Sequence, residues 1–220
     1  MAVKGAGYLV VASALLLGVS GHVLWYQAWA FLLLTVTMQV LASRVMLRDN
    51  ADLAKERSRL QPGTKPWDKI LVALVALVLP LATFVTAALD VRRHWPPPVP
   101  LPLTAAGWLV CAAGGALVFR SMVANRFFSA TVRIQSDRGH KVVSAGPYRF
   151  VRHPGYVGMI AFNLGQAPAL GSWWALVPGV LTAAVLVLRT ALEDRTLQAE
   201  LEGYREYAER VRYRLVTGIW

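Results

Sequence analysis

Apolar residues occur along the chain in long runs that short polar segments separate. The first two runs cover residues 7–18 and 23–46, with the break Ser20-Gly21-His22 between them. A predominantly apolar run of about 20 residues can cross a bilayer as a helix. The pattern therefore predicts a helical hairpin here, and the immediate start of the second run favours it over a cleaved signal peptide.

Four further apolar runs follow, at residues 70–89, 103–123, 155–170 and 172–188. Pro80 predicts a kink in the first of them, because proline cannot donate the backbone hydrogen bond of a helix. A Gly-Ser turn joins the last two runs into a second hairpin. The pattern as a whole predicts an all-α, polytopic transmembrane helical bundle with five to six membrane helices in hairpins.

The polar segments differ in positive charge. Segments 44–69 and 120–152 each contain seven Lys or Arg, and residues 189–220 contain six, whereas segment 90–100 contains two. Basic residues collect in the cytoplasmic loops of membrane proteins. We therefore expect the two long segments and the C-terminus in the cytoplasm.

Segment 44–69 also contains the acids Asp52, Glu56 and Asp68. Its length and charge predict an exposed loop that carries a short surface helix. In the next polar segment, a Pro-Pro-Pro run excludes a helix over those three residues.

Composition agrees with a membrane protein. Of the 220 residues, 56% are hydrophobic and 16% are charged, whereas soluble domains carry roughly 25% charged residues. The net charge of +11 lies in clusters between apolar runs, without zinc-ligand spacing or a basic repeat. Membrane topology accounts for this charge, so we expect no nucleic-acid partner and no metal site. The single cysteine, Cys111, is interpreted as a packing residue.

Residues 146–158 read GPYRFVRHPGYVG and contain two arginines, one histidine, two tyrosines, two prolines and three glycines. Pro147 and Pro154 fix bends, and Pro154 is suited to the first position of the following helix. Arg152 and His153 then lie at a helix N-terminus on the membrane edge, a setting that suits an anionic or polarisable ligand. The alternative is that they only anchor the membrane topology.

The residues after the last apolar run predict a cytoplasmic amphipathic helix over 189–214. Residues on one helical face recur at spacings of four and three: Glu193, Leu197, Glu200, Tyr204, Tyr207 and Val211. On a straight helix Glu193 and Tyr207 would lie about 21 Å apart. Contact with one small ligand therefore needs a bend, for which Gly203 is the natural place. An Arg189–Glu193 ion pair along the helix is the alternative role for these charges.

Asn163 and Gln166 are polar residues on one face of a membrane helix. Buried amides in hydrocarbon need partners, so hydrogen bonding between helices competes with substrate binding as their role.

The combination of these elements resembles a known signature. The residues that carry it are Tyr148, Arg152-His153-Pro154, Tyr156 and Gly158, followed by Arg189, Glu193-Asp194, Leu197, Gly203, Tyr204, Tyr207 and Val211. They resemble the C-terminal region of the isoprenylcysteine carboxyl methyltransferase and phospholipid methyltransferase superfamily. The resemblance covers about residues 125–220. Two positions depart from the usual pattern: Asp194 replaces a second glutamate, and Thr217 replaces a proline.

The resemblance implies an integral-membrane enzyme that uses S-adenosyl-L-methionine without a Rossmann domain. It implies N-terminal transmembrane helices over 1–123 on the substrate side, and a catalytic region over 124–220 with a hairpin at 155–188 and a helix at 189–214. The implied catalytic residues are Arg152, Arg189 and Glu193. The implied cofactor-binding residues are Tyr148, His153, Pro154, Tyr156, Gly158, Glu193, Asp194, Tyr204 and Tyr207. Asn163 and Gln166 are the candidates for contact with a lipophilic or lipidated substrate that enters from the bilayer.

The sequence leaves the methyl acceptor open between a carboxylate, an amine and a thiol. A carboxylate is already nucleophilic at neutral pH, whereas an amine must lose a proton, for which Glu193 or His153 is a candidate. Membrane sterol reductases, which use NADPH, share part of the signature and a tail like Tyr213-Arg214-Leu215, but they are longer. A non-enzymatic membrane scaffold or transporter is the third alternative.

Overall fold

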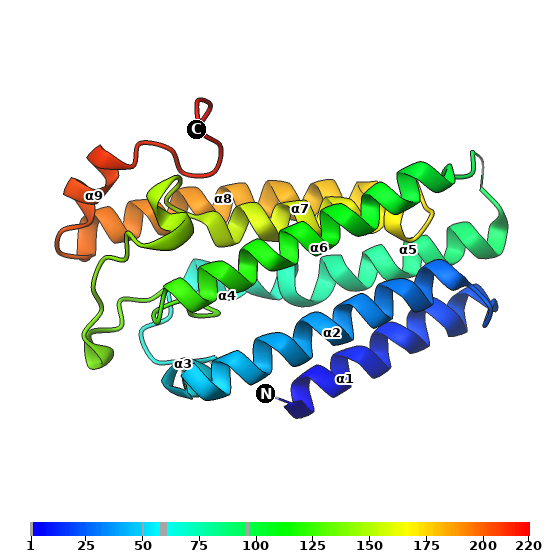
Figure 1. The fold of residues 1–220 in the computed structure, drawn as a ribbon, viewed down its shortest axis with the longest axis horizontal. Coiled ribbons are helices and arrows are strands. Elements are labelled where there is room, and N and C mark those ends of the chain that lie inside the picture. Colours follow the sequence, from blue (N-terminus) through cyan, green and yellow to red (C-terminus); the bar gives the residue numbers. More distant parts are fainter. Residues whose placement is uncertain (1, 50, 58–60, 96) are drawn as a thin grey trace.

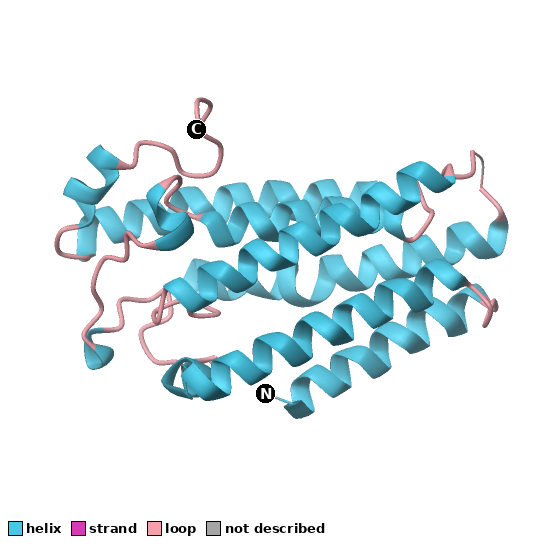
Figure 2. Cartoon of the chain, viewed as in Figure 1, coloured by secondary structure: helices cyan, strands magenta, loops and turns pink. Residues whose placement is uncertain are grey.

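The computed structural model describes residues 2–49, 51–57, 61–95 and 97–220, and all regular secondary structure in them is helical (Figure 2). The predicted all-α class is therefore confirmed. The long helices lie side by side and form an elongated bundle (Figure 1).

The predicted N-terminal hairpin is present. Helix α1 (Ala2–Ser13) continues as a π-helical turn over Ala14–Val19, and α2 (Tyr26–Asp49) returns beside it (Figure 1). The short helix α3 (Ala51–Glu56) follows.

The next span is one continuous helical segment with a π-helical turn inside it. It consists of α4 (Pro66–Ala73), a π-helical turn at Leu74–Val78 and α5 (Leu79–Arg93). Pro80 is the second residue of α5, separated from the π-helical turn by one residue, and prolines and π-bulges are the usual causes of a bend in a helix. The irregularity of this turn therefore lies next to Pro80, and the kink itself stays a prediction.

The second half of the bundle contains α6 (Leu101–Ala124), α7 (Pro154–Ala169) and α8 (Leu176–Glu200). A Cβ atom added to Gly114 of α6 would lie 2.6 Å from the carbonyl oxygen of Gly158 in α7, and one added to Gly107 would lie 2.5 Å from the backbone nitrogen of Ala169. The two helices approach closely at these positions, because only glycine leaves room for the backbone of the neighbouring helix.

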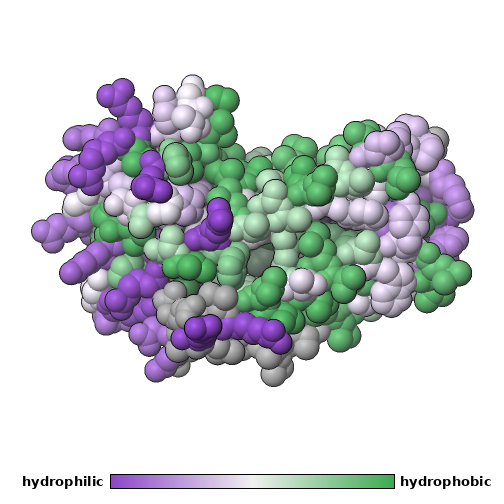
Figure 3. All heavy atoms as spheres, viewed as in Figure 1, coloured by the Kyte–Doolittle hydropathy of each residue, from purple (hydrophilic) through white to green (hydrophobic). Residues whose placement is uncertain are grey.

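Four helices in the described residues are long and apolar enough to cross a membrane: 26–44, 66–93, 101–124 and 176–200. Their outer faces are apolar, with Leu33 68% and Leu109 72% exposed. Figure 3 shows this apolar surface as a belt between hydrophilic ends. The chain thus has four candidate membrane spans, and the shorter α7 and the segment Gly7–Val19 lie beside these long helices (Figure 1).

The prediction that segment 44–69 is simply an exposed loop is wrong for two of its acids. Glu56 is 5% exposed and Asp68 is fully buried. Each of them forms an ion pair with an arginine from the second half of the chain, Glu56 with Arg133 and Asp68 with Arg189. The segment is therefore packed against the elements that form the cavity described below.

The bend expected at Gly203 is present, but the prediction of one helix over 189–214 is wrong, because its first part belongs to α8 and residues 211–214 are not helical. Helix α8 ends at Glu200, Gly203 has a φ of 75°, and α9 (Tyr204–Arg210) begins directly after it. A left-handed backbone conformation of this kind favours glycine. The turn folds α9 back toward the end of α8 (Figure 1).

Candidate functional site

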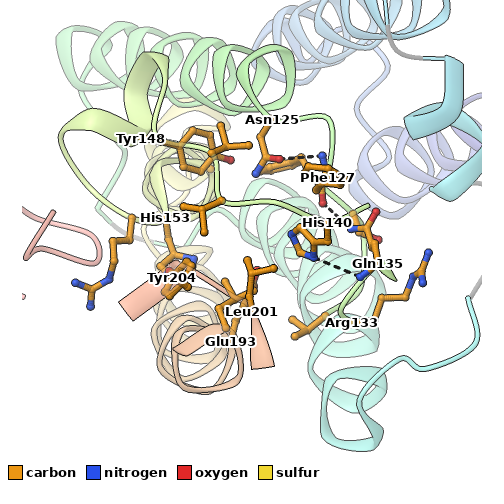
Figure 4. Close-up of a pocket in the computed structure, with 18 of the residues that line it drawn as sticks. Asn125, Phe127, Arg133, Gln135, His140, Tyr148, His153, Glu193, Leu201 and Tyr204 are labelled. Atoms are coloured by element: carbon orange, nitrogen blue, oxygen red, sulfur yellow. Dashed lines mark hydrogen bonds between the residues drawn. The ribbon is translucent and has the colours of Figure 1, made fainter. Parts of the chain in front are cut away.

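A cavity lies at the polar end of the bundle, between the connection 125–143, the start of α7, the end of α8 and α9. Figure 4 shows Tyr148, His153, Glu193 and Tyr204 on one side of it and Phe127, Gln135 and His140 on the other. Eight residues of the predicted site line it: Tyr148, Arg152, His153, Tyr156, Arg189, Glu193, Tyr204 and Tyr207.

The start of α7 is held by the C-terminal segment. Pro154 is the first residue of α7, as the sequence predicts. The backbone N–H groups of Arg152 and His153 donate to the carbonyl oxygens of Tyr213 and Arg214, both at 2.9 Å. The two halves of the predicted site are therefore joined through their backbones.

Asp194 lies behind the cavity wall as a fully buried counter-ion. Its carboxylate accepts from Arg152 Nε at 2.8 Å, from Arg214 Nε at 2.9 Å and from the Tyr204 hydroxyl at 3.0 Å. The other donors of Arg152 are also used, because its Nη1 donates to two carbonyl oxygens just after α9. Asp194 thus organises the wall and does not line the cavity.

Arg189 pairs with Asp68, and the alternative pairing with Glu193 along the helix is not formed. Arg189 donates to the two oxygens of Asp68 at 2.6 and 3.1 Å and to the carbonyl oxygen of Ala130 at 2.9 Å. Its guanidinium lies 5.3 Å from the centre of the Tyr156 ring. The Tyr156 hydroxyl in turn donates to Glu193. These contacts therefore place the Arg189 guanidinium, the Tyr156 ring and the Glu193 carboxylate in a row along the cavity.

Tyr148, Tyr204 and Tyr207, which lie outside the spans, are neutral phenols at physiological pH. Burial raises the pKa of Tyr207 to about 12 and also raises the pKa of Tyr148 and of Tyr204. Tyr207 donates its hydroxyl to the Tyr148 carbonyl oxygen at 2.7 Å. These residues therefore supply aromatic faces and neutral polar groups, and they cannot act as bases.

The opposite wall was missed by the sequence analysis. The Gln135 amide donates to the Phe127 carbonyl oxygen at 2.8 Å, and the backbone N–H of Gln135 donates to His140 Nδ1 at 3.3 Å. Burial, with Arg133 and Arg138 nearby, lowers the pKa of His140 to about 4. The imidazole is therefore neutral, and because Nδ1 accepts, its proton is on Nε2.

The sequence offers only a faint signal for this wall. The aromatic pair Phe127-Phe128 within a polar connection is unusual for a loop in water. No periodicity accompanies it, since the connection contains only the short 3₁₀-helix Ser136–Arg138.

Some predicted residues lie away from the cavity lining. Gly158 packs against α6, as described above. Asn163 donates its amide to the Met159 carbonyl oxygen at 2.8 Å, and Gln166 donates to the Asn163 side chain at 3.2 Å. The structure thus does not bring Asn163 and Gln166 to the wall that the tyrosines and Glu193 form.

A cavity at the polar end of helices that are long and apolar enough to cross a membrane is typical of a polytopic membrane protein, and it is the candidate site of this chain. Comparison with known proteins then shows which family the segment that forms most of this site is similar to. Residues 105–199 match the isoprenylcysteine carboxyl methyltransferase (ICMT) family. The resemblance drawn from the sequence is thereby confirmed for this segment.

Two plant proteins illustrate the similarity. A probable protein-S-isoprenylcysteine O-methyltransferase of Oryza sativa subsp. indica is 31% identical over 97 residues, which cover 41% of this chain and 48% of the relative. Protein-S-isoprenylcysteine O-methyltransferase B of Arabidopsis thaliana is 29% identical over 92 residues, which cover 41% and 47%. The alignments thus span about half the length of these curated relatives.

Proposed function

We propose that this protein is an integral-membrane methyltransferase that transfers a methyl group from S-adenosyl-L-methionine to a lipophilic acceptor, with the carboxylate of a prenylcysteine-like substrate as the first choice and a lipid amine as the second. The observation that carries the proposal is the convergence of Glu193, Tyr156, His153 and Arg189 on one cavity. All four lie within the segment that matches the family.

The donor set of the cavity fits a sulfonium cofactor. A sulfonium is a cation, and cations are attracted to carboxylates and to aromatic faces. Glu193 supplies the carboxylate, and Tyr148, Tyr156 and Tyr204 supply aromatic rings on the same cavity. We assign Tyr207 and His153 to the same cofactor site.

The volume of the cavity sets a condition for cofactor binding. Its volume is about 90 Å³, whereas pockets for drug-sized ligands measure roughly 300–1,000 Å³. Cofactor binding therefore requires the wall to move outward. We assign this movement to the connection 125–143, because it is the part of the wall that is not built from membrane-length helices.

When bound, S-adenosyl-L-methionine supplies an electrophilic methyl group. In-line displacement at such a group needs positioning and exclusion of water more than covalent help. We propose that Arg189 faces the anionic group of the acceptor and that Glu193, oriented by Tyr156, lies beside the reacting atoms. Arg152 supports catalysis by holding Asp194 and the C-terminal segment in place. For an amine acceptor, Glu193 is the candidate that removes the proton.

We also propose the topology. The four long helices, with the segment 7–19 and α7, give six membrane helices, and the excess of Lys and Arg places the cavity end and the C-terminus in the cytoplasm. Residues 1–123 then form the substrate side and residues 124–220 the catalytic region. Asn163 and Gln166 remain candidates for contact with the lipid part of a substrate within the bilayer.

Calorimetric titration of the detergent-purified protein with S-adenosylhomocysteine and, separately, with NADPH tests the cofactor assignment. We expect saturable binding of S-adenosylhomocysteine, weakened at least tenfold by Glu193→Gln and by His153→Ala. Asn163→Ala is the matched control, since Asn163 lies on α7 outside the cavity lining and should leave this affinity unchanged.

Transfer of a labelled methyl group to N-acetyl-S-farnesylcysteine then tests the acceptor. Binding of NADPH alone would favour the reductase alternative. Binding of neither ligand by folded protein would contradict an enzymatic role for the cavity. Binding of S-adenosylhomocysteine without methyl transfer to the farnesylcysteine would support the cofactor assignment. It would contradict the carboxylate acceptor and favour a lipid amine instead.

A further inference from the structure

The outer face of the last turns of α8 forms the floor of a surface groove of about 710 Å³ that shares no lining residue with the cavity. Ala191 and Leu192 contribute to the floor. The rim contains Arg195 from α8, Arg205 from α9, and Arg214 with Trp220 from the C-terminal segment. Three separate elements thus direct an arginine to one groove.

The rim arginines retain donors for a ligand. Arg205 uses its Nε for the Gln198 carbonyl oxygen at 2.9 Å, and Arg214 uses its Nε for Asp194 at 2.9 Å. Within the described part of the chain, no carboxylate pairs with Arg195 or Arg205, and both are exposed. The groove therefore gathers three guanidinium groups, of which Arg214 pairs with Asp194 and the other two have no carboxylate partner in the described residues.

The groove lies where a membrane helix leaves the bilayer. Its floor belongs to the last turns of the candidate span 176–200. On the C-terminal segment beside it, Val216 is 48% and Ile219 is 80% exposed. Figure 3 shows hydrophilic residues gathered at this end of the molecule, directly next to the apolar belt. The groove and the segment beside it therefore combine apolar side chains, an indole and guanidinium groups. This combination suits the boundary between the acyl chains and the headgroups of a bilayer.

We propose that this groove binds one anionic phospholipid, with the headgroup phosphate between Arg195, Arg205 and Arg214. Guanidinium groups match the geometry of phosphate oxygens and bind them through paired hydrogen bonds. Basic pockets at the cytoplasmic ends of membrane helices are suited to such headgroups. The indole of Trp220, which lies 4.9 Å from the Arg214 guanidinium, borders the glycerol region. This proposal stands independently of methyl transfer.

Native mass spectrometry of the full chain in detergent, with equimolar phosphatidylglycerol and phosphatidylcholine, tests the proposal. We expect one phosphatidylglycerol to be retained in preference to phosphatidylcholine. Arg195→Gln combined with Arg205→Gln should lower this retention at least fivefold. The matched control is Arg210→Gln with Arg212→Gln, which removes the same charge from exposed residues outside the groove and should behave like the wild type.

Three results would overturn the proposal. An equal loss in both double variants would mean that diffuse charge attracts the lipid. No loss in the groove variant would place the lipid elsewhere. Displacement of phosphatidylglycerol by an equal concentration of soluble glycerol phosphate would assign the groove to a free phosphate ligand. If the groove double variant does not fold, Arg195→Gln alone carries the test, because Arg195 is exposed and no carboxylate pairs with it in the described residues.

Discussion

At the scale of single residues, Asp68 connects the first half of the chain to the cavity. Its buried carboxylate accepts from Arg189 at 2.6 Å and from the backbone N–H of Val132 at 2.6 Å. Asp68 lies outside the segment that matches the family, whereas Arg189 lies inside it. The orientation of Arg189 toward the Tyr156 ring therefore depends on a residue that the family segment does not contain.

We predict that Asp68→Asn lowers methyl transfer at least tenfold and lowers the melting temperature, because a buried guanidinium loses its counter-ion. Breaking a buried ion pair costs about 3–5 kcal/mol. The measurement is a double-mutant cycle of activity and thermal unfolding with Arg189→Gln. Since Asp68 acts through Arg189, Asp68→Asn should add little to the loss that Arg189→Gln causes alone. Fully additive effects would contradict this coupling.

At the scale of elements, the contact between α6 and α7 fixes the position of the helix that begins the site. The two backbones approach at Gly114 and Gly158, so each glycine faces the backbone of the other helix. His153 caps α7 at its cavity end. A change in the distance between these helices would therefore shift His153 and Tyr156 within the cavity.

We predict that Gly114→Ala strongly destabilises the protein, whereas Gly115→Ala is tolerated. The new Cβ at Gly114 meets backbone atoms at 2.6 and 2.7 Å, which cannot yield without moving α7. At Gly115 it meets the end of the Met38 side chain, which can change rotamer. Thermal unfolding in detergent compares the two variants. Equal melting temperatures would show that the α6–α7 contact is more adaptable than the packing indicates.

At the scale of the whole molecule, the cavity joins the two halves of the chain. Glu56 pairs with Arg133 at 2.8 Å, and Arg133 belongs to the connection that forms the second wall. The hydrogen bond from Arg133 lowers the pKa of Glu56, so this pair stays charged at neutral pH. The connection is thus tied to α3 on one side and covers the end of α8 on the other.

We predict that S-adenosylhomocysteine slows amide hydrogen exchange in residues 126–145 and around α9, because the ligand needs this wall to open and then close over it. Exchange on the opposite end of the bundle, near residues 90–95, serves as the internal reference and should not change. Hydrogen-exchange mass spectrometry with and without the ligand makes the comparison. Protection confined to the membrane helices would contradict a mobile wall.

The sequence by itself determined the helices and much of one wall of the site. Apolar runs of membrane length favour helices, because a backbone in lipid must satisfy its own hydrogen bonds. The fixed φ of Pro154 suits the start of α7, and the left-handed conformation that Gly203 tolerates allows the tail to bend. The motif residues Tyr148, His153 and Glu193, which the family resemblance implies as site residues, line the cavity.

The tertiary structure alone decided which charges meet and what forms the second wall. The pair between Asp68 and Arg189 joins residues 121 positions apart, and no periodicity selects one acid from several at that separation. The wall that contains Phe127, Gln135 and His140 has almost no regular secondary structure, so its contacts arise from packing against helices distant in sequence. The backbone preference of each residue depends on its type and can be predicted from the sequence. Burial and ion pairing depend on residues distant in sequence and form only when the chain folds.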